Sequence, residues 1–326
     1  MNATTVATSK PANKQPLVAV VGATTVGKTS AAICLARDLG GEVVSADSRY
    51  LYRGMDIGTA TPSEDEMAGV PHYLINILDP TDDYSLSLYQ RDAYQAIDDI
   101  LRRGRLPILA GGTPLYVNAV LQGWRIPEVP PDPAFRAALE ELATSEGPES
   151  LHARLREADP VVAARTPAAN VRRVIRALEI YHATGQRMSD LEGREPPPYR
   201  VLILGLQVPR EELFARIDRR VEVQIASGLV AEVRALLARG VPPGAPAMSA
   251  IGYPQIVDYL ENRNTLDQAI RQIKYDTHRY ARHQMTWLRR MRDVHWFDPR
   301  EAGWYEAALA LARSFAGNET AQNPLA

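Results

Sequence analysis

The sequence predicts an α/β fold, in which helices cover a parallel β-sheet, together with an all-helical insertion domain. Strand and helix patterns alternate in the first part of the chain, as they do in parallel sheets. A proline-rich stretch at residues 124–133 then opens a segment with helical patterns only, and a strand pattern returns near residue 201. We therefore expect one α/β domain that is interrupted once and then completed.

The first strand pattern leads into a motif for binding phosphate. Residues 18–21 are an apolar, valine-rich run, and residues 30–39 have a helical pattern that ends at two glycines. The segment between them fits the P-loop pattern G-x-x-x-x-G-K-[ST] and consists of Gly22, Ala23, Thr24, Thr25, Val26, Gly27, Lys28 and Thr29. Its backbone N–H groups and the helix N-terminus favour an anion, Lys28 adds a charge, and the Thr29 hydroxyl is suited to Mg²⁺. The sequence thus predicts a polyphosphate site in a P-loop NTPase-like sheet.

The next elements continue the alternation. Residues 42–46 read as a second strand, and residues 56–60 as a glycine-marked loop. A helix is expected over residues 87–103, followed by a third strand at residues 106–110. Pro114 is typical of the first turn of another helix. These elements belong to the same parallel sheet and its cover.

The later elements set the domain boundaries. Pro167 is expected to begin a helix over residues 168–184, with Gly185 ending it. Residues 201–206 and 294–297 read as further strands with helices between them. We therefore predict these parts: a flexible tail at 1–16, the catalytic core at 17–124 and 197–316, the helical insertion at 125–196, and a second tail at 317–326.

Composition narrows the class of protein. The 326 residues are 45% hydrophobic with a net charge of −2, so any contact with nucleic acid must use local basic clusters. The single cysteine, Cys34, excludes an internal disulfide and a cysteine zinc site. No apolar run has the length of a membrane span, and the N-terminal segment does not have the pattern of a secretory signal. We expect a cytoplasmic protein, with monomer as the default state.

Asp47 is the first candidate for chemistry. It follows the second strand, at the sheet edge where open parallel sheets bind ligands. A carboxylate there can accept a proton or hold a donor, although a turn aspartate would look the same in sequence. The third strand ends in Gly111, Gly112 and Thr113, without the carboxylate that holds magnesium in many P-loop NTPases. This disfavours a motor ATPase, and Asp47 is left as the available metal carboxylate.

Basic side chains form two further candidate groups. Arg216 and Arg220 are four residues apart on a predicted helix, so they either clamp a pyrophosphate or lie solvated on its surface. Residues 271–292 hold nine basic side chains interleaved with Tyr275, Tyr280 and Trp287, which is typical of RNA contact but also of a solvated face. These basic side chains are Arg271, Lys274, His278, Arg279, Arg282, His283, Arg289, Arg290 and Arg292. The insertion adds Arg136, Arg172, Arg173 and Arg176.

Taken together, these segments resemble one known family. The ordered matches cover residues 22–29, 47–49, 52–60, 71–74, 111–116, 251–253 and 280–289. In this set the chain resembles the tRNA dimethylallyltransferases, also called tRNA isopentenyltransferases. The resemblance implies transfer of a dimethylallyl group from its diphosphate to N6 of the adenine on the 3′ side of the anticodon in tRNA, giving N6-isopentenyladenosine.

The resemblance also assigns roles. It implies that the P-loop holds the diphosphate with Mg²⁺, that Arg220 together with Arg216 clamps it, and that Asp47 accepts the N6 proton. Lys28, Thr29, Asp47 and Arg220 are thus the implied catalytic residues. Thr113 would line the channel through which the base reaches the donor. The implied tRNA contacts are Asp47, Ser48, Arg49, Tyr50, Thr113, Arg136, Asn170, Val171, Arg172, Arg173, Val174, Ile251, Gly252, Tyr253, Arg279 and Arg282.

The chain departs from the family pattern at a few positions. Tyr50 stands where glutamine is usual, and a phenol cannot make the bidentate contact of an amide. Thr61 replaces a usual lysine, and His278 and His283 replace commoner arginines. Three other functions remain: a prenyltransferase acting on free adenine nucleotides, a P-loop small-molecule kinase, and a non-catalytic RNA-binding module. The kinase leaves the basic helix unexplained, free nucleotides need no basic clusters, and Lys28 with Asp47 speaks against a module without catalysis.

Overall fold

The computed structural model describes residues 14–317, which divide into two compact units. The first unit holds the described chain up to Ser85, then Tyr89–Val117, and the described chain from Pro198 onward. The second holds Leu86–Leu88 and Asn118–Pro197, and the predicted insertion, 125–196, falls within that range. The predicted tails lie outside the described residues, apart from residues 14–16 and 317. Within the described chain, no helix combines the length and apolar character needed to cross a membrane.

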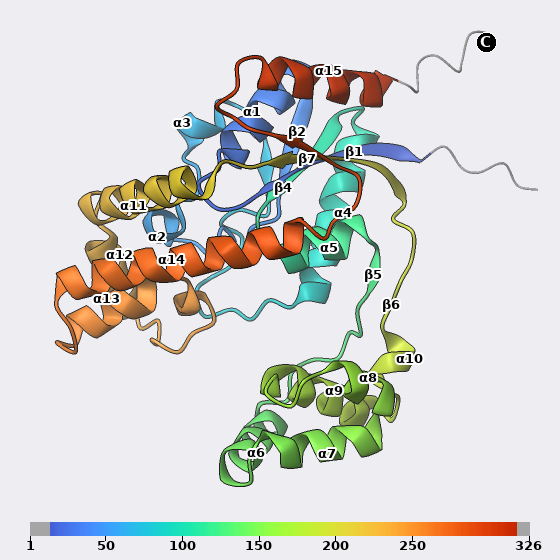
Figure 1. Ribbon diagram of the computed structural model, residues 1–326, viewed down its shortest axis with the longest axis vertical. Coiled ribbons are helices and arrows are strands. Elements are labelled where there is room, and N and C mark those ends of the chain that lie inside the picture. The colour runs from blue at the N-terminus through green and yellow to red at the C-terminus, as the bar shows by residue number, and fades with distance from the viewer. Residues whose placement is uncertain (1–13, 318–326) are drawn as a thin grey trace, which may run out of the picture. The chain divides into compact units, whose positions relative to one another are not determined.

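The first unit is built on a parallel sheet of six strands (Figure 1). The strand order is β3-β2-β4-β1-β7-β8, and every neighbouring pair is parallel. The strands are β1 (Gln15–Gly22), β2 (Gly41–Ser45), β3 (His72–Tyr73), β4 (Leu106–Gly111), β7 (Tyr199–Leu206) and β8 (Val294–Phe297). The predicted α/β fold with a covered parallel sheet is confirmed.

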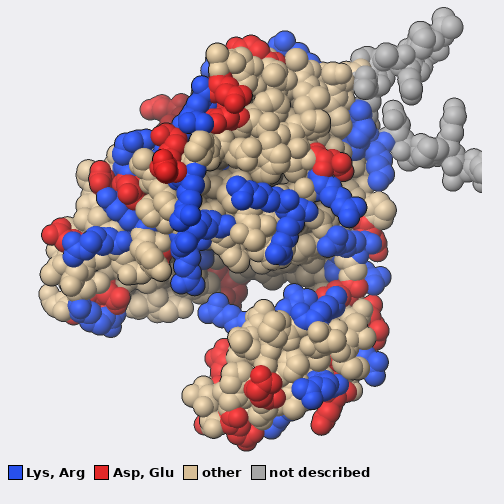
Figure 2. Space-filling model, viewed as in Figure 1, with Lys and Arg blue, Asp and Glu red and all other residues tan. Residues whose placement is uncertain are grey.

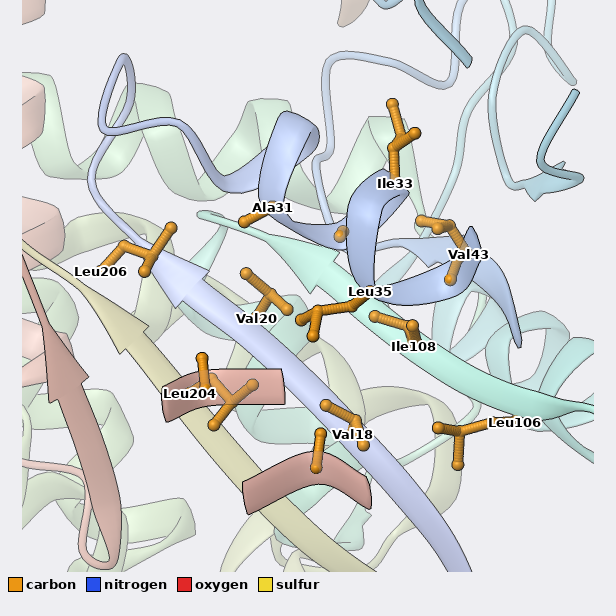
Figure 3. Close-up of a cluster of buried hydrophobic side chains, with 14 of the residues drawn as sticks. Val18, Val20, Ala31, Ile33, Leu35, Val43, Leu106, Ile108, Leu204 and Leu206 are labelled. Carbon is orange, nitrogen blue, oxygen red and sulfur yellow. The ribbon is translucent and has the colours of Figure 1, made fainter. Parts of the chain in front are cut away.

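Strand β1 lies inside the sheet, and its composition explains why. Every residue of β1 after Gln15 is buried. Val18 and Val20 pack with Leu35 of α1 (Lys28–Leu39) and with neighbouring strands (Figure 3), and Ala312 of α15 (Trp304–Gly317) joins the same cluster. Side chains alternate along a strand, so Leu17, Ala19 and Val21, also buried, face the other side of the sheet. An uninterrupted apolar run is what a strand covered on both faces requires.

Two boundaries of the first unit differ from the prediction. Strand β1 begins at Gln15, so residues 15 and 16 were wrongly assigned to the tail. Helix α1 begins at Lys28, two residues earlier than expected, because Gly27 at φ 103° turns the chain into it. Gly40, at φ 64°, ends the helix as predicted.

Residues 56–60 are also not the predicted loop. They include the short helix α2 (Asp56–Thr59), which is held by the side chain of Glu232. The Glu232 carboxylate accepts the N–H groups of Ile57 at 2.7 Å and Gly58 at 3.0 Å. Because this carboxylate comes from α12 (Leu229–Ala238), far along the chain, the local sequence carries no signal for the helix.

Apart from α3, which was not predicted, the remaining helices of the first unit agree with the predicted helical segments. They are α3 (Glu64–Met67), α4 (Leu86–Arg102), α5 (Pro114–Leu121), α11 (Arg210–Ala226), α12 (Leu229–Ala238), the short 3₁₀ turn η1 (Ala247–Ser249), α13 (Tyr253–Leu260) and α14 (Leu266–Leu288). Helix α4 begins in the second unit and α5 ends in it. The basic segment 271–292 lies mainly on α14, which Thr265 and Gln268 cap reciprocally at its start.

The second unit is mainly helical. It contains α6 (Pro133–Ser145), α7 (Pro148–Ala158), α8 (Pro160–Arg165), α9 (Val171–Thr184) and α10 (Met188–Leu191), with an antiparallel pair of β5 (Trp124–Arg125) and β6 (Gly193–Arg194). The prediction that Pro167 begins a helix is wrong. Helix α9 begins after Asn170, whose side chain accepts the Arg173 N–H, and Gly185 ends it as expected.

Candidate active site

The ends of three neighbouring strands open into one cavity of about 880 Å³ in the first unit. The loop after β1, the turn after β2 and the turn after β4 all line it, together with α11 and α14. The cavity brings together the chemical groups that the sequence singled out: Lys28, Thr29, Asp47, Thr113 and Arg220. Parallel strands end at the same edge of a sheet, which explains how residues so far apart in sequence converge.

The P-loop is shaped for close contact with an anion. Thr25 has a φ of 63°, a strained value for a β-branched residue, and its buried hydroxyl has no hydrogen-bond partner. A Cβ at Gly22 would lie 2.7 Å from the Leu206 carbonyl oxygen, so only glycine fits there. Lys28 Nζ donates to the Ala23 carbonyl at 2.6 Å. Strain and unpartnered polar atoms of this kind are typical of ligand-binding loops.

Lys28 should make anion binding sensitive to pH. Burial lowers the pKa of Lys28 to about 8, opposed by nearby Asp47 and reinforced by Arg220. Only the protonated amine attracts a diphosphate, so affinity is full below this pKa and is lost as the pH rises through it. We expect the dissociation constant of pyrophosphate, measured by calorimetry, to rise about tenfold from about pH 7 to about pH 9.

The matched control is Lys28→Arg, because a guanidinium stays charged throughout this range. The arginine variant should show a much flatter profile than the wild type. Parallel profiles would assign the titration to another group, including the pyrophosphate itself.

Asp47 both shapes its turn and faces the cavity. Its Oδ1 accepts the Arg49 N–H at 3.0 Å, and its own N–H donates to Ser45 Oγ at 3.3 Å. The next residue is fixed as well, because the Ser48 N–H donates to Thr113 Oγ1 at 3.0 Å. The two interpretations left open by sequence therefore describe the same residue, a turn aspartate whose carboxylate lines the ligand cavity.

The structure separates the two predicted clamp arginines. Arg220 Nη1 donates to Thr24 Oγ1 at 3.2 Å, and its Nη2 donates to the Thr59 carbonyl at 2.8 Å. Arg216 instead forms an ion pair with Glu212 at 2.6 Å and does not line the cavity. Arg220 is therefore placed to hold an anion in the P-loop. The prediction that Arg216 also belongs to the clamp is wrong, because its guanidinium pairs with Glu212 away from the cavity.

Tyr50 lies on the phosphate side of the cavity. Burial raises the pKa of its phenol, and Thr29 and Arg220 lie among the side chains near it. The resemblance placed Tyr50 among tRNA contacts, but its neighbours are the groups expected to hold the diphosphate. The phenol therefore lies beside the guanidinium and the threonine hydroxyl that the diphosphate would contact.

Removing this phenol oxygen should weaken anion binding. Without it, the Arg220 guanidinium and the Thr29 hydroxyl lose a polar neighbour in the cavity, which costs about 1 kcal/mol. We expect Tyr50→Phe to raise the dissociation constant of pyrophosphate about fivefold, by calorimetry at constant pH. Tyr52→Phe, a nearby buried tyrosine that does not line the cavity, is the control and should leave it unchanged. Equal binding by wild type and Tyr50→Phe would contradict this role.

The other predicted tRNA contacts of the first unit differ in accessibility. Arg49 lines the cavity and donates to Ser249 Oγ at 3.2 Å, and Ile251 lines the cavity near it. Arg279 and Arg282 are exposed on α14. Tyr253 is fully buried and donates to the Met55 carbonyl at 2.8 Å. Its side chain is therefore structural and not available to RNA.

The predicted tRNA contacts of the second unit also differ in accessibility. Arg136 pairs with buried Glu179 at 2.7 Å. Burial alone would raise the pKa of Glu179, but hydrogen bonds from Arg136, the Asp132 N–H and Arg176 hold it at about 2. Val174 is fully buried in the core of the unit, with Val171 packed against it, so these two valines do not present side chains to RNA. Asn170, Arg172 and Arg173 remain as predicted contacts.

Sequence reasoning assigned no role to one buried residue of the site, Gln284 on α14. It lies between Ala281 and Leu288 on the buried side of the helix and accepts the Thr24 N–H at 2.9 Å. The available signal was a polar residue within an apolar stripe, because a buried amide needs partners.

Basic side chains gather over the region of α11 and α14 on the surface (Figure 2).

Comparison with known proteins gives a consistent result. A family model described as IPP transferase matches residues 50–291, and one described as isopentenyl transferase matches residues 15–77. The chain is 65% identical over 293 residues to a tRNA dimethylallyltransferase of Thermomicrobium roseum, covering 90% of this chain and 89% of the relative. It is 53% identical over 279 residues to that of Roseiflexus castenholzii, covering 86% of this chain and 91% of the relative.

Solved structures agree with the sequences. A tRNA isopentenylpyrophosphate transferase from Bacillus halodurans, 40% identical, has a TM-score of 0.71 over 94% of this chain and 99% of its own. A eukaryotic dimethylallyltransferase acting on tRNA, 26% identical, has a TM-score of 0.80 over 95% of this chain and 81% of its own. The fold, the shared cavity and these relatives agree, and the chain belongs to the tRNA dimethylallyltransferase family.

Proposed function

We propose that this protein transfers a dimethylallyl group from dimethylallyl diphosphate to N6 of the adenine on the 3′ side of the anticodon in tRNA. One observation carries the proposal: the P-loop and Asp47 line the same cavity. An anion site and a proton acceptor within one cavity are what this transfer needs. The family membership supplies the acceptor class, tRNA.

The groups around the cavity match the charges that develop during the reaction. The bond between the allylic carbon and the diphosphate oxygen breaks, a bond from N6 to that carbon forms, and the N6 proton passes to Asp47. Diphosphate leaves with the bonding electron pair, so Lys28, Arg220 and the loop N–H groups stabilise it in place. The Thr24 N–H is already bonded to Gln284, so other loop groups serve the leaving group.

Asp47 supplies the second requirement. A neutral exocyclic amine is a weak nucleophile, and a nearby carboxylate that removes its proton improves it. The contact between Asp47 Oδ1 and the Arg49 N–H fixes the direction of the carboxylate before the base arrives. The structure therefore supports a base that is positioned by its own turn.

Magnesium fits this arrangement as a partner of the diphosphate. Within residues 14–317 no group of three or more His, Cys, Asp or Glu side chains could hold a metal ion alone. Magnesium often takes one or two protein ligands and completes its shell with substrate phosphates and water. The Thr29 hydroxyl is the proposed protein ligand, and Asp47 is the nearby carboxylate. When bound, the ion would neutralise charge on the leaving diphosphate.

The cavity also suits an extruded base. Its volume of about 880 Å³ is near the upper end for ligand pockets, which leaves room for a purine beside a small donor. Unstacking a base costs least in a loop such as the anticodon loop. Exposed Arg279 and Arg282 on α14 are the proposed contacts to the phosphates of the tRNA backbone.

We further propose that the protein is cytoplasmic and monomeric. Its single cysteine agrees with a reducing compartment.

One assay tests the function against its alternatives. The protein is incubated with radiolabelled dimethylallyl diphosphate and either tRNA, AMP or, in a separate reaction, labelled ATP with small acceptors. Label should move to tRNA and stay absent from an anticodon stem-loop whose target adenine is replaced by purine, which has no exocyclic amine. Transfer to AMP but not to tRNA, or phosphate transfer from ATP, would overturn the proposal.

A further inference from the structure

Gln284 is the one side chain of α14 that reaches two loops of the cavity at once. Its side chain is 1% exposed. Oε1 accepts the Thr24 N–H of the P-loop at 2.9 Å, and Nε2 donates to the Gly112 carbonyl after β4 at 2.7 Å. A single amide therefore ties the anion-binding loop and the turn after β4 to the basic helix.

The Gln284 amide is closely packed against the P-loop and the turn after β4. A Cβ at Gly112 would lie 2.6 Å from Gln284 Nε2, 3.0 Å from the Gly22 carbonyl oxygen and 3.3 Å from Lys28 Nζ. The amide, the first glycine of the loop and the catalytic lysine thus surround one point. If the Gln284 side chain moved, it would therefore press against the P-loop that holds the anion.

Tyr280 extends the connection to the acceptor side. It lies one helical turn before Gln284 on the same face, lines the cavity, and has Thr113 and Gln284 among its near neighbours. Thr113 in turn accepts the Ser48 N–H, next to Asp47. The donor loop and the turn of the proposed base are therefore both attached to α14, whose Arg279 and Arg282 are exposed.

We infer that Gln284 is a positioning residue for the donor: it holds the P-loop in register with α14 and with the turn after β4. The inference rests on the proposed function, since it concerns the same diphosphate. Losing Gln284 should weaken diphosphate binding while RNA binding, which uses the exposed side of α14, is retained. The residue acts through the loop and need not touch either substrate.

Two substitutions separate positioning from simple packing. Gln284→Met keeps length and makes neither hydrogen bond. Gln284→Glu keeps an acceptor for the Thr24 N–H but loses the donor to Gly112 and places a negative charge beside Lys28. Loss of packing alone predicts that glutamate is the milder change. A positioning role next to the anion site predicts that glutamate is the more severe one.

The measurements are dissociation constants for pyrophosphate and for tRNA, with thermal unfolding as a check of folding. We expect Gln284→Met to raise the pyrophosphate constant about tenfold and Gln284→Glu about a hundredfold, with tRNA affinity within about twofold. The glutamate defect should shrink as the pH falls, because a protonated carboxyl again donates to Gly112. Gln272→Met, at an exposed position of the same helix, is the control and should change neither constant.

Pyrophosphate binding by Gln284→Met equal to wild type would overturn the inference, and so would equal losses for both ligands or a milder glutamate variant. If Gln284→Met fails to fold, Tyr280→Phe, which removes the phenol oxygen near Gln284 and Thr113, should raise the pyrophosphate constant in its place, and an unchanged constant would overturn the inference. A wild-type protein that binds no pyrophosphate would instead refute the proposed function itself.

Discussion

Replacing Asp47 with asparagine should lower kcat for tRNA prenylation by a factor of about 10² to 10⁴, the usual worth of a general base. The asparagine carbonyl can still accept the Arg49 N–H, so the turn after β2 keeps its shape. What is lost is the ability to take the N6 proton. We therefore expect the dissociation constants for tRNA and for the donor to change by less than about threefold, measured by filter binding and calorimetry.

A second variant separates chemistry from turn geometry. Ser45→Ala removes the acceptor of the Asp47 N–H but leaves the carboxylate, so it should cost far less than Asp47→Asn. If the two variants slow the reaction equally, Asp47 acts by shaping the turn. Equal losses of kcat and of tRNA affinity in Asp47→Asn would likewise remove the assignment of Asp47 as the base.

Local patterns predicted most of the sheet. Most of the strands found in advance are largely buried, and an apolar run such as residues 18–21 is typical of a strand covered on both faces. Strand β8 was also predicted, although none of its residues is fully buried. Strands β3, β5 and β6 have two residues each, and such pairings follow from tertiary contacts that leave no periodicity. Helix α2 was missed for the same reason, because Glu232 caps it from α12.

The site was predictable where topology alone brings residues together. Lys28, Asp47 and Thr113 follow three strands of one parallel sheet, so they had to meet at its edge. Helix faces are harder, because the burial of each turn depends on the partner helix. This is why Tyr253, predicted to contact RNA, is buried, and why Gln284 had no assigned role although it contacts the P-loop.

Arg220 and Arg216 give the sharpest test of this difference, since they share one helix and one sequence pattern. Arg220 contacts the P-loop at Thr24, and Arg216 pairs with Glu212 outside the cavity. Arg220→Met should therefore lower kcat/KM by about 10² to 10³, as loss of a preorganised charge at a leaving group does. Arg216→Met, the matched control, should lower it by no more than about twofold, because it loses one partly exposed ion pair.

The steady-state kinetics of the Arg220→Met and Arg216→Met variants are measured at saturating tRNA while the donor concentration is varied. Arg220 stabilises a charge that grows as diphosphate departs, so its loss should fall on kcat as well as on KM for the donor. A loss confined to KM would mean that Arg220 binds the donor equally before and during transfer. Equal losses of kcat/KM from both variants would mean that both arginines contribute to the reaction, as their i, i+4 spacing suggested. The different contacts of Arg216 and Arg220 would then not explain their roles. The geometry favours the unequal result, because Arg220 also donates to the Thr59 carbonyl and is held facing the loop before any substrate binds.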